Sequence, residues 1–291
     1  MKPYLANAAA AAAVLRSHHI IARKKYGQNF LIDASVLEDT VEAAGIGKDD
    51  FVLEIGPGIG TLTQYLAEAA GRVYAVEIDR TLLPVLEDTL SGFKNVTVAE
   101  GDILKEDVRA IVDRENGGKS LKAAANLPYY ITTPIIMKLL TCGAPISGMT
   151  FMVQKEVADR MQAEPGTKAY GALTLAVQYY SVPRTVRDVP PSAFVPQPGV
   201  VSSVIHLRKH GEPPVSVKDE KLMFSVIKAS FAQRRKKLVN GLTGAPELGL
   251  TRETAEAAMS YAGIDPGVRG ETLSLQEFAA LTDAVFDVTK M

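Results

Sequence analysis

The chain has 291 residues, 47% of them hydrophobic, which is enough for one large domain and a second, smaller one. Its formal net charge of −1 gives no overall indication of a polyanionic partner, and no apolar run approaches the ~20 residues of a membrane span. A single cysteine, Cys142, excludes an internal disulfide framework and a cysteine-based zinc cluster. The four histidines show no metal-ligand spacing. We therefore expect a protein of the reducing cytoplasm that uses no metal and no membrane.

An alanine-rich segment, residues 1–24, opens the chain. Met1-Lys2 and the alanines from Ala8 to Ala13 resemble a secretion signal only faintly, because the positive region is thin and polar residues follow Leu15 at once. Alanine has the highest helix propensity, so we favour an N-terminal helix. We treat the segment as an N-terminal extension.

Short β-rich runs alternate with helical patterns from residue 25 to residue 209. Such alternation predicts one α/β domain with a parallel, doubly wound sheet. A proline-rich loop, instead of a helix, joins the last two runs, so we expect an antiparallel edge there. The predicted strands cover residues 51–55, 72–78, 95–99, 122–127, 149–153, 182–189 and 203–207.

Beyond a Gly-Glu-Pro-Pro linker at residues 211–214 the pattern is helical, which predicts a small all-helical domain over residues 210–291. Thr251 and Ser274 are expected helix N-caps, and Ser274 with Glu277 would form a capping box.

Basic residues gather in two places. Between residues 208 and 240, nine Lys or Arg residues stand against three acids, and Arg23, Lys24 and Lys25 make the N-terminal region basic as well. A charge run is compatible with an ordinary solvated surface, so this distribution alone favours a polyanion only weakly.

A glycine turn follows the first predicted strand of the domain. Gly56-x-Gly58-x-Gly60 would let the backbone approach a ligand closely, and the helix that follows offers free N–H groups. Glu77 ends the next strand, where an acid can accept from both hydroxyls of a ribose. The ligand could be a dinucleotide or S-adenosylmethionine, and the glycine spacing favours the latter. Asp102, after the third strand, could accept from an adenine amino group or simply cap a turn.

The tetrad Asn126-Leu127-Pro128-Tyr129 ends the fourth strand. The exocyclic amine of adenine is a poor nucleophile, because its lone pair is delocalised into the ring. An amide oxygen and a backbone carbonyl could hold its hydrogens while an aromatic ring grips the base. Taken alone, the tetrad is more typical of a strand end followed by a proline turn. Its place beside three other strand ends indicates a ligand-binding edge of the sheet.

A series of motifs, taken together, resembles the ribosomal RNA adenine dimethyltransferase family, and within it the branch that acts on bacterial small subunits. The resemblance runs from about Arg23 to the C-terminus. The motifs are the glycine turn, the tetrad, Lys25–Leu31, Ala75–Asp79, Gly101–Leu104, Tyr130–Pro134, Gln154–Ala158, Phe194–Ser202 and Phe231–Leu238.

The resemblance implies a Rossmann-like class I S-adenosylmethionine-dependent methyltransferase sheet with a helical C-terminal domain. Asn29 and Leu31 would close over the methyl donor, and Gly56 with Gly58 would lie against its methionine moiety. Glu77 would take the ribose hydroxyls. Asp102 would contact the adenine end, and S-adenosyl-L-homocysteine would be the product.

For the target base, the resemblance implies that Asn126 and the Leu127 carbonyl, held by Pro128, orient the amine. Tyr129 would stack on the adenine, and Phe194 is predicted to stack from the other side, with a loop anchor as its alternative role. No side-chain nucleophile or metal is required, since positioning and electrostatics suffice.

The implied substrate is 16S rRNA in the small ribosomal subunit, with N6,N6-dimethylation of two adjacent adenosines in a hairpin loop near its 3′ end and a role in subunit biogenesis. The basic groups Arg23, Lys24, Lys25 and Arg234-Arg235-Lys236-Lys237 would contact phosphates. We expect a cytoplasmic monomer. Two alternatives stay open: a large-subunit rRNA adenine methyltransferase of the antibiotic-resistance type, and a chiefly non-catalytic assembly factor.

Overall fold

The structure, a computed structural model, describes residues 4–23 and 27–290. The chain divides into two compact units: Met1–Ala158 with Val182–Lys209, and Asp159–Ser181 with His210–Met291. The sequence places residues 159–181 in the first domain, whereas the structure groups them with the second unit. The reason is hydrophobic burial, because Tyr170, Leu175 and Tyr179 belong to the core of that unit.

A seven-stranded sheet, in the order β4-β3-β2-β5-β6-β9-β7, organises the first unit. β2, β3, β4, β5 and β6 pair in parallel, and β9 pairs antiparallel with β6. The last two strands, β9 and β7, lie at one edge of the sheet, as expected. A second, two-stranded sheet joins β1 to β8. The strands are β1 (Phe30–Leu31), β2 (Phe51–Ile55), β3 (Arg72–Glu77), β4 (Val96–Glu100), β5 (Leu121–Asn126), β6 (Ile146–Gln154), β7 (Ser181–Val189), β8 (Phe194–Val195) and β9 (Ser202–Lys209).

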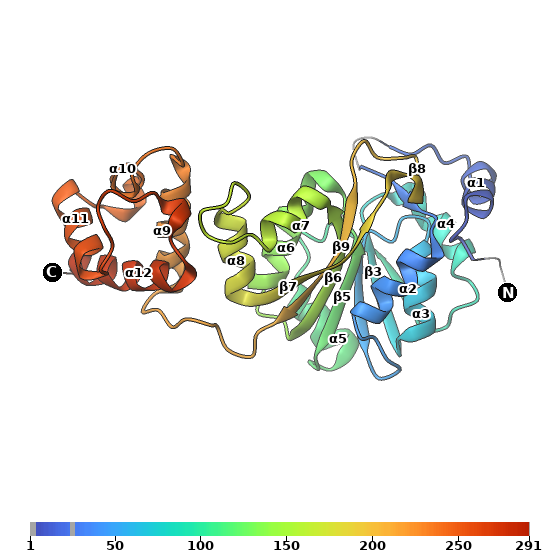
Figure 1. Ribbon diagram of the computed structural model, residues 1–291. Helices are drawn as coiled ribbons and strands as arrows, with labels where there is room; N and C mark the ends of the chain where they lie inside the picture. Colours follow the sequence, from blue (N-terminus) through green and yellow to red (C-terminus); the bar gives the residue numbers. More distant parts are fainter. Residues whose placement is uncertain (1–3, 24–26, 291) are drawn as a thin grey trace. The chain divides into compact units, whose positions relative to one another are not determined.

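Helices cover both faces of the large sheet (Figure 1). Leu37 of α2 and Leu66 of α3 are buried in one core with Val52, Val73 and Val204 of the strands. The chain crosses toward the second unit within α7 (Lys155–Met161). The other helical elements of this unit are α1 (Ala8–Ser17), α2 (Ala34–Ala43), α3 (Thr61–Ala69), η2 (Arg80–Leu82), α4 (Leu83–Thr89), α5 (Val108–Asn116), η3 (Tyr129–Ile131), α6 (Thr132–Thr141) and η4 (Pro191–Ala193).

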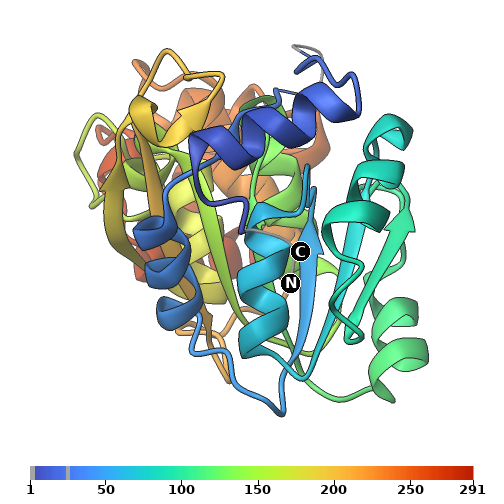
Figure 2. The same cartoon turned by 90° about the vertical axis from the view of Figure 1, so that its right-hand side faces the viewer.

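The N-terminal extension contains the expected helix, α1, which Asn7 caps by accepting from the Ala10 backbone N–H. Ala11 is fully buried and shares a small core with Leu82 and Phe30, next to the glycine turn. Figure 2 shows α1, in dark blue, beyond the upper ends of the central strands. The extension therefore forms part of the first unit.

The second unit is helical. Its elements pack around a core that includes Phe278, Met223 and Leu281. The capping box predicted at Ser274 and Glu277 is present, and Thr251 caps α11 as expected. The helical elements are α8 (Ala172–Tyr180), α9 (Glu220–Ala232), α10 (Leu238–Thr243), η5 (Pro246–Leu248), α11 (Arg252–Tyr261), η6 (Gly270–Thr272) and α12 (Leu275–Lys290). Of the helices that the structure describes, none is both long and apolar enough to cross a membrane.

Candidate active site

A cleft opens at the carboxyl edge of the large sheet. Four segments contribute to its walls: residues 27–31, 54–62, 77–82 and 126–131. It encloses about 780 Å³ of space, part of it open to solvent. This volume suits a small molecule, and the place is where open α/β sheets bind ligands, beside the point where strand order reverses around β2.

The glycine turn forms the floor of the cleft. Gly56 (φ +65°) and Gly58 (φ +63°) both occupy the left-handed region, which other residues rarely adopt. A Cβ atom at Gly58 would lie 3.3 Å from the ring of Phe30, whereas a Cβ at Gly56 would meet nothing within 4 Å. The turn thus leaves open space above Gly56 for a ligand that approaches the backbone.

Substitution of Gly58 by alanine is expected to destabilise the fold by about 1–3 kcal/mol, through the strained φ and the contact with Phe30. The displaced turn should also weaken ligand binding. Thermal unfolding and titration calorimetry measure the two effects. Gly45→Ala is a matched control for backbone strain, because Gly45 has φ +58° and open surroundings but lies outside the cleft. Equal ligand affinities in the two variants would contradict this role of Gly58.

Glu77 stands at the end of β3 with its carboxylate fixed from two sides. Its Oε2 accepts from the Gly58 backbone N–H (3.1 Å) and its Oε1 from that of Asp79 (2.8 Å). Burial raises the pKa of the Glu77 carboxyl, against the effect of these two hydrogen bonds. The side chain therefore holds one orientation at the cleft wall.

Asp79 ties the N-terminal region to this strand end. The Gln28 amide donates to Asp79 Oδ2 (2.8 Å), and Arg23 Nη1 donates to Asp79 Oδ1 (3.3 Å). Desolvation opposes ionisation of Asp79, but hydrogen bonds from Thr81 and Gln28 and the charge of Arg23 outweigh it and lower the pKa. Arg23, which the sequence predicts to contact RNA, thus has an acidic partner in the protein. Lys24 and Lys25 lie outside the described residues.

Glu54 lines the cleft, at one of the strand ends that the sequence places along the ligand-binding edge, although no specific ligand contact was predicted for it. It is 1% exposed, and no described residue bonds to its Oε2. Burial, and to a lesser degree the charge of Glu77, raises the pKa of Glu54 to about 8. The sequence does indicate this position. Glu54 stands two residues before Gly56, so it must lie near the end of the buried strand that leads into the glycine turn. A buried carboxyl oxygen without a partner suits a cationic or hydrogen-bond-donating ligand group.

The raised pKa of Glu54 predicts a pH-dependent stability. The folded chain keeps a proton that the unfolded chain loses above its ordinary pKa of 4.5, so this stabilisation is complete below pH 4.5 and lost as pH rises to about 8. Glu54→Gln cannot ionise. We expect its Tm to rise relative to wild type by roughly 5 °C or more between pH 5 and pH 8.5, measured without ligand. A Tm difference that stays constant over this range would contradict the prediction.

The tetrad at the end of β5 closes the opposite wall. Asn126 Nδ2 donates to the backbone carbonyl of Asn29 (2.9 Å), which fixes the amide and leaves Oδ1 as its available acceptor. The Leu127 backbone N–H donates to the Met152 carbonyl of β6 (3.0 Å). The first bond links the segment that carries Asn29 and Leu31 to the tetrad, and the second links the tetrad to β6. The cleft lining includes Asn29, Leu31, Asn126 and Leu127.

Of the Leu127 and Pro128 carbonyls, only one has no hydrogen-bond partner among the described residues. The Pro128 carbonyl accepts from the Ile131 N–H (3.2 Å) and from the Thr132 hydroxyl (3.0 Å). No bond to the Leu127 carbonyl is present among the described residues. The Leu127 carbonyl is therefore available to a ligand as a backbone acceptor, and its contact with a target amine stays a prediction.

Tyr129 is held by its hydroxyl. Its Oη lies 2.6 Å from Ser202 Oγ of β9, and burial raises the pKa of the phenol. An aromatic ring fixed at one end presents a defined face beside Asn126. The neighbouring Tyr130 is 55% exposed and also lines the cleft.

Phe194 does not occupy the position expected from the sequence. It is 1% exposed, pairs with Leu31 across the two-stranded sheet and belongs to the core with Leu37 and Val204. A ring buried to this extent has no face left for a base. The structure corrects the stacking prediction and assigns Phe194 the alternative role of an anchor that holds the loop and Leu31 in place.

Asp102 is not among the residues that line the cleft. Its Oδ1 accepts from the Leu104 backbone N–H (3.0 Å), and Lys105 Nζ lies 3.8 Å from Oδ2. The first of these bonds places Asp102 in a turn after β4, one of the two roles that the sequence left open, and the adenine contact stays a prediction. Within residues 4–23 and 27–290, no cluster of three His, Cys, Asp or Glu side chains is arranged to hold a metal ion.

The basic motif of the second unit divides into two kinds of side chain. Arg234 is paired with Glu271, whereas Arg235, Lys236 and Lys237 are exposed. The three exposed cations are accessible to a partner, and their contacts with phosphate stay a prediction.

Comparison with known proteins gives consistent results. Residues 20–285 match the family model described as Ribosomal RNA adenine dimethylase. The Ribosomal RNA small subunit methyltransferase A of Lachnoclostridium phytofermentans is 54% identical, over 99% of this chain and 99% of its own length. The structure of a dimethyladenosine transferase from Plasmodium falciparum shares the fold, with a TM-score of 0.71 and 24% identity over 87% of this chain and 95% of that one. The 23S rRNA methyltransferase ErmE has a TM-score of 0.67 and 27% identity, over 89% of this chain and 100% of its own.

Proposed function

This chain belongs to the ribosomal RNA adenine dimethylase family, and from that membership we propose its reaction. It transfers methyl groups from S-adenosylmethionine to the N6 atoms of two adjacent adenosines, in a hairpin loop near the 3′ end of 16S rRNA. The observation that carries the proposal is the joint position of the glycine turn, Glu77 and Asn126–Tyr129 on one cleft.

The cleft fits the methyl donor. The buried, unpartnered Oε2 of Glu54 suits the amino group of the methionine moiety, and the open space above Gly56 suits its approach to the backbone. Glu77 would accept from the ribose hydroxyls, with Asn29 and Leu31 over the donor and Asp102 toward its adenine end. When bound, S-adenosylmethionine supplies a methyl group on a positively charged sulfur that leaves as neutral S-adenosyl-L-homocysteine.

The tetrad prepares the amine. Asn126 Oδ1 and the Leu127 carbonyl accept its two hydrogens, which draws the nitrogen toward tetrahedral geometry and directs its lone pair into the cleft. Tyr129 stacks on the adenine and sets the angle of attack. With the methyl donor bound, the nitrogen lone pair would displace the neutral thioether from the methyl carbon, and the surplus proton would pass from the nitrogen to water. Asn126 and Leu127 hold the amine throughout as hydrogen-bond acceptors. After one transfer a hydrogen remains for one acceptor, so the same arrangement serves a second transfer.

The partner under this proposal is the small ribosomal subunit. The target adenines must be unstacked to enter the cleft, which favours a hairpin loop over a duplex. Exposed cations of the second unit, Arg235 to Lys237, would contact phosphates, so binding should weaken with salt. We propose a cytoplasmic protein that acts as a monomer.

The large-subunit enzyme is the second candidate, since ErmE shares the fold and 27% identity. The 54% identity over nearly full length favours the small-subunit reaction. Mapping N6,N6-dimethyladenosine in both rRNAs, from cells with and without this protein, separates the two. We expect two adjacent adenosines of 16S rRNA to lose the modification. A loss confined to 23S rRNA would overturn the proposal.

A further inference from the structure

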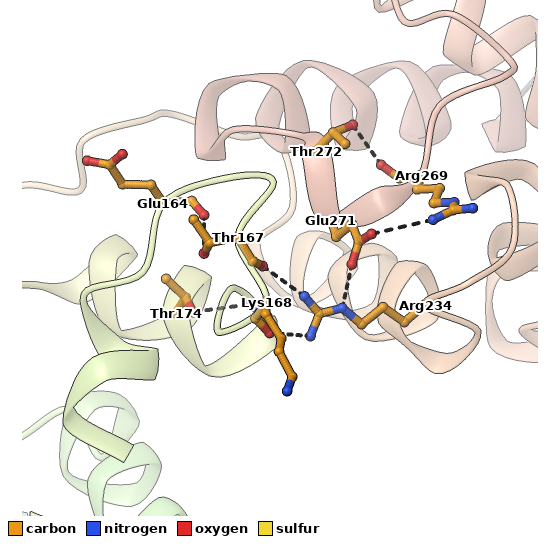
Figure 3. A network of polar contacts seen from close by, with 9 residues as sticks. Glu164, Thr167, Lys168, Thr174, Arg234, Arg269, Glu271 and Thr272 are labelled. Carbon is orange, nitrogen blue, oxygen red and sulfur yellow. Dashed lines mark hydrogen bonds and ion pairs between the residues drawn. The ribbon is translucent and has the colours of Figure 1, made fainter. Parts of the chain in front are cut away.

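Arg234 joins two loops of the second unit. Its Nε donates to the Glu271 carboxylate, its Nη1 to the Lys168 carbonyl (2.7 Å) and its Nη2 to the Thr167 carbonyl (2.9 Å). Figure 3 shows the guanidinium between the two segments, with all three contacts drawn. One side chain thus holds the loop that precedes α8 against the turn that follows α9.

The loop before α8 is fixed at further points. The Gly166 N–H donates to the Glu271 backbone carbonyl (2.7 Å), and the Tyr170 hydroxyl donates to that of Leu273 (2.7 Å). The Tyr170 ring meets Phe231 edge-on at 6.0 Å. Residues 166–170 are therefore held in one conformation by α9, η6 and the chain after it.

This arrangement presents a set of free cations. Lys168, Arg235, Lys236 and Lys237 are exposed, and in the described part of the chain no acid forms an ion pair with any of them.

The segments around these cations carry a net positive charge. Residues 163–170, 232–238 and 269–272 together contain six basic residues and two acidic ones. One of the two acids, Glu271, is already shared between Arg234 and Arg269. Figure 3 shows the Lys168 ammonium pointing away from the Arg234 guanidinium, without a contact.

We propose that Lys168 extends the basic motif into one phosphate-binding surface with Arg235, Lys236 and Lys237, and that Arg234 is a positioning residue for it. Arg234 uses three of its five N–H donors within the protein. Its role is therefore to hold the Lys168 loop, and it does not contact phosphate. The proposal rests on the proposed function, because it takes RNA as the partner. It gives the loop 163–170 an RNA contact that no motif indicated.

Lys168→Ala tests the surface. The probe is the small ribosomal subunit from cells that lack this protein, with binding measured by filter retention over a range of salt and without methyl donor. Loss of one phosphate contact should weaken binding about 5–10-fold near 0.1 M salt and lower the salt slope by about 1. Lys221→Ala, an exposed lysine at the start of α9, is the control and should bind within about twofold of wild type. Because Lys168 is exposed, its substitution should leave Tm unchanged, which thermal unfolding measures. Wild-type binding by Lys168→Ala would overturn the proposal.

Glu271→Ala separates positioning from charge. Removing an acid from a basic surface should strengthen RNA binding if only electrostatics matter. If Arg234 and Glu271 hold the loop, binding should instead weaken several-fold, although the surface has become more positive. Arg234→Lys should also weaken binding, because an ammonium keeps the charge but cannot reach all three acceptors. Tighter binding by Glu271→Ala, or unchanged binding by Arg234→Lys, would refute the positioning role.

The two proposals fail in different ways. If wild-type protein does not methylate adenosines of the small subunit, the proposed function is wrong whatever the lysine variant does. If it does methylate them and Lys168→Ala binds like wild type, the surface alone is wrong. A double variant, Lys168→Ala with Glu271→Ala, adds a check: positioning predicts that the second substitution costs little once Lys168 is gone.

Discussion

Substitution of Asn126 by alanine is expected to lower methyl transfer by about 10³-fold, with donor affinity changed by less than about threefold. The alanine removes the acceptor that holds one hydrogen of the target amine. It also removes the bond from Asn126 Nδ2 to the Asn29 carbonyl, but Asn29 stays in a segment that β1 and β8 fix independently. Single-turnover methylation and calorimetry with S-adenosylmethionine measure the two quantities.

Asn126→Asp gives the matched control. It keeps a side-chain oxygen for the amine but loses the N–H that orients the group toward Asn29, and its charge faces the carbonyl. We expect intermediate activity, below wild type and above alanine. Wild-type turnover in Asn126→Ala would show that the tetrad does not activate the amine, and equal losses in donor binding and turnover would make Asn126 a donor contact only.

Features encoded by nearby residues could be predicted from the sequence. The helix caps at Thr251 and Ser274 depend on a side chain and a backbone N–H three positions apart, and both are present. The glycine turn depends on left-handed φ values that glycine alone adopts easily, and Gly56 and Gly58 have them. The strand ends then meet at one edge because parallel strands leave no other arrangement.

Features that depend on distant partners could not be predicted. Phe194 sits in a proline-rich loop that gives no sign of a core to join, yet the short pairing with β1 buries it. In the sequence, Arg234 is one of four consecutive cations with nothing to distinguish it. Only the fold brings the Glu271 carboxylate and the Lys168 backbone carbonyl to its guanidinium. Residues 159–181 continue an α/β pattern, but Tyr170 and Tyr179 supply apolar surface to the helical core. In each case the deciding contact joins segments far apart in the sequence.

Glu77→Ala is expected to weaken S-adenosylmethionine binding by about 100-fold or more, since hydrogen bonds to a charged acceptor contribute roughly 1.5–3 kcal/mol each. Methylation at ordinary donor concentrations should be lost. Binding to immature small subunits should change by less than about twofold, because the exposed cations of the second unit are untouched. Retained binding without catalysis would also permit a separate role in subunit assembly.

Glu77→Ala also removes hydrogen bonds that support the fold. Glu77 also accepts from the backbone N–H groups of Gly58 and Asp79, so the alanine variant loses support for the glycine turn. Glu77→Gln keeps the size and one acceptor but replaces the other with a donor that faces an N–H group. If the ribose contact is what determines affinity for S-adenosylmethionine, both variants should bind S-adenosylmethionine more weakly than wild type. Their Tm values should nevertheless differ from each other. If Glu77→Ala fails to bind subunits although its Tm shows a folded protein, methyl-donor binding and subunit binding are linked, and an assembly role independent of catalysis is ruled out.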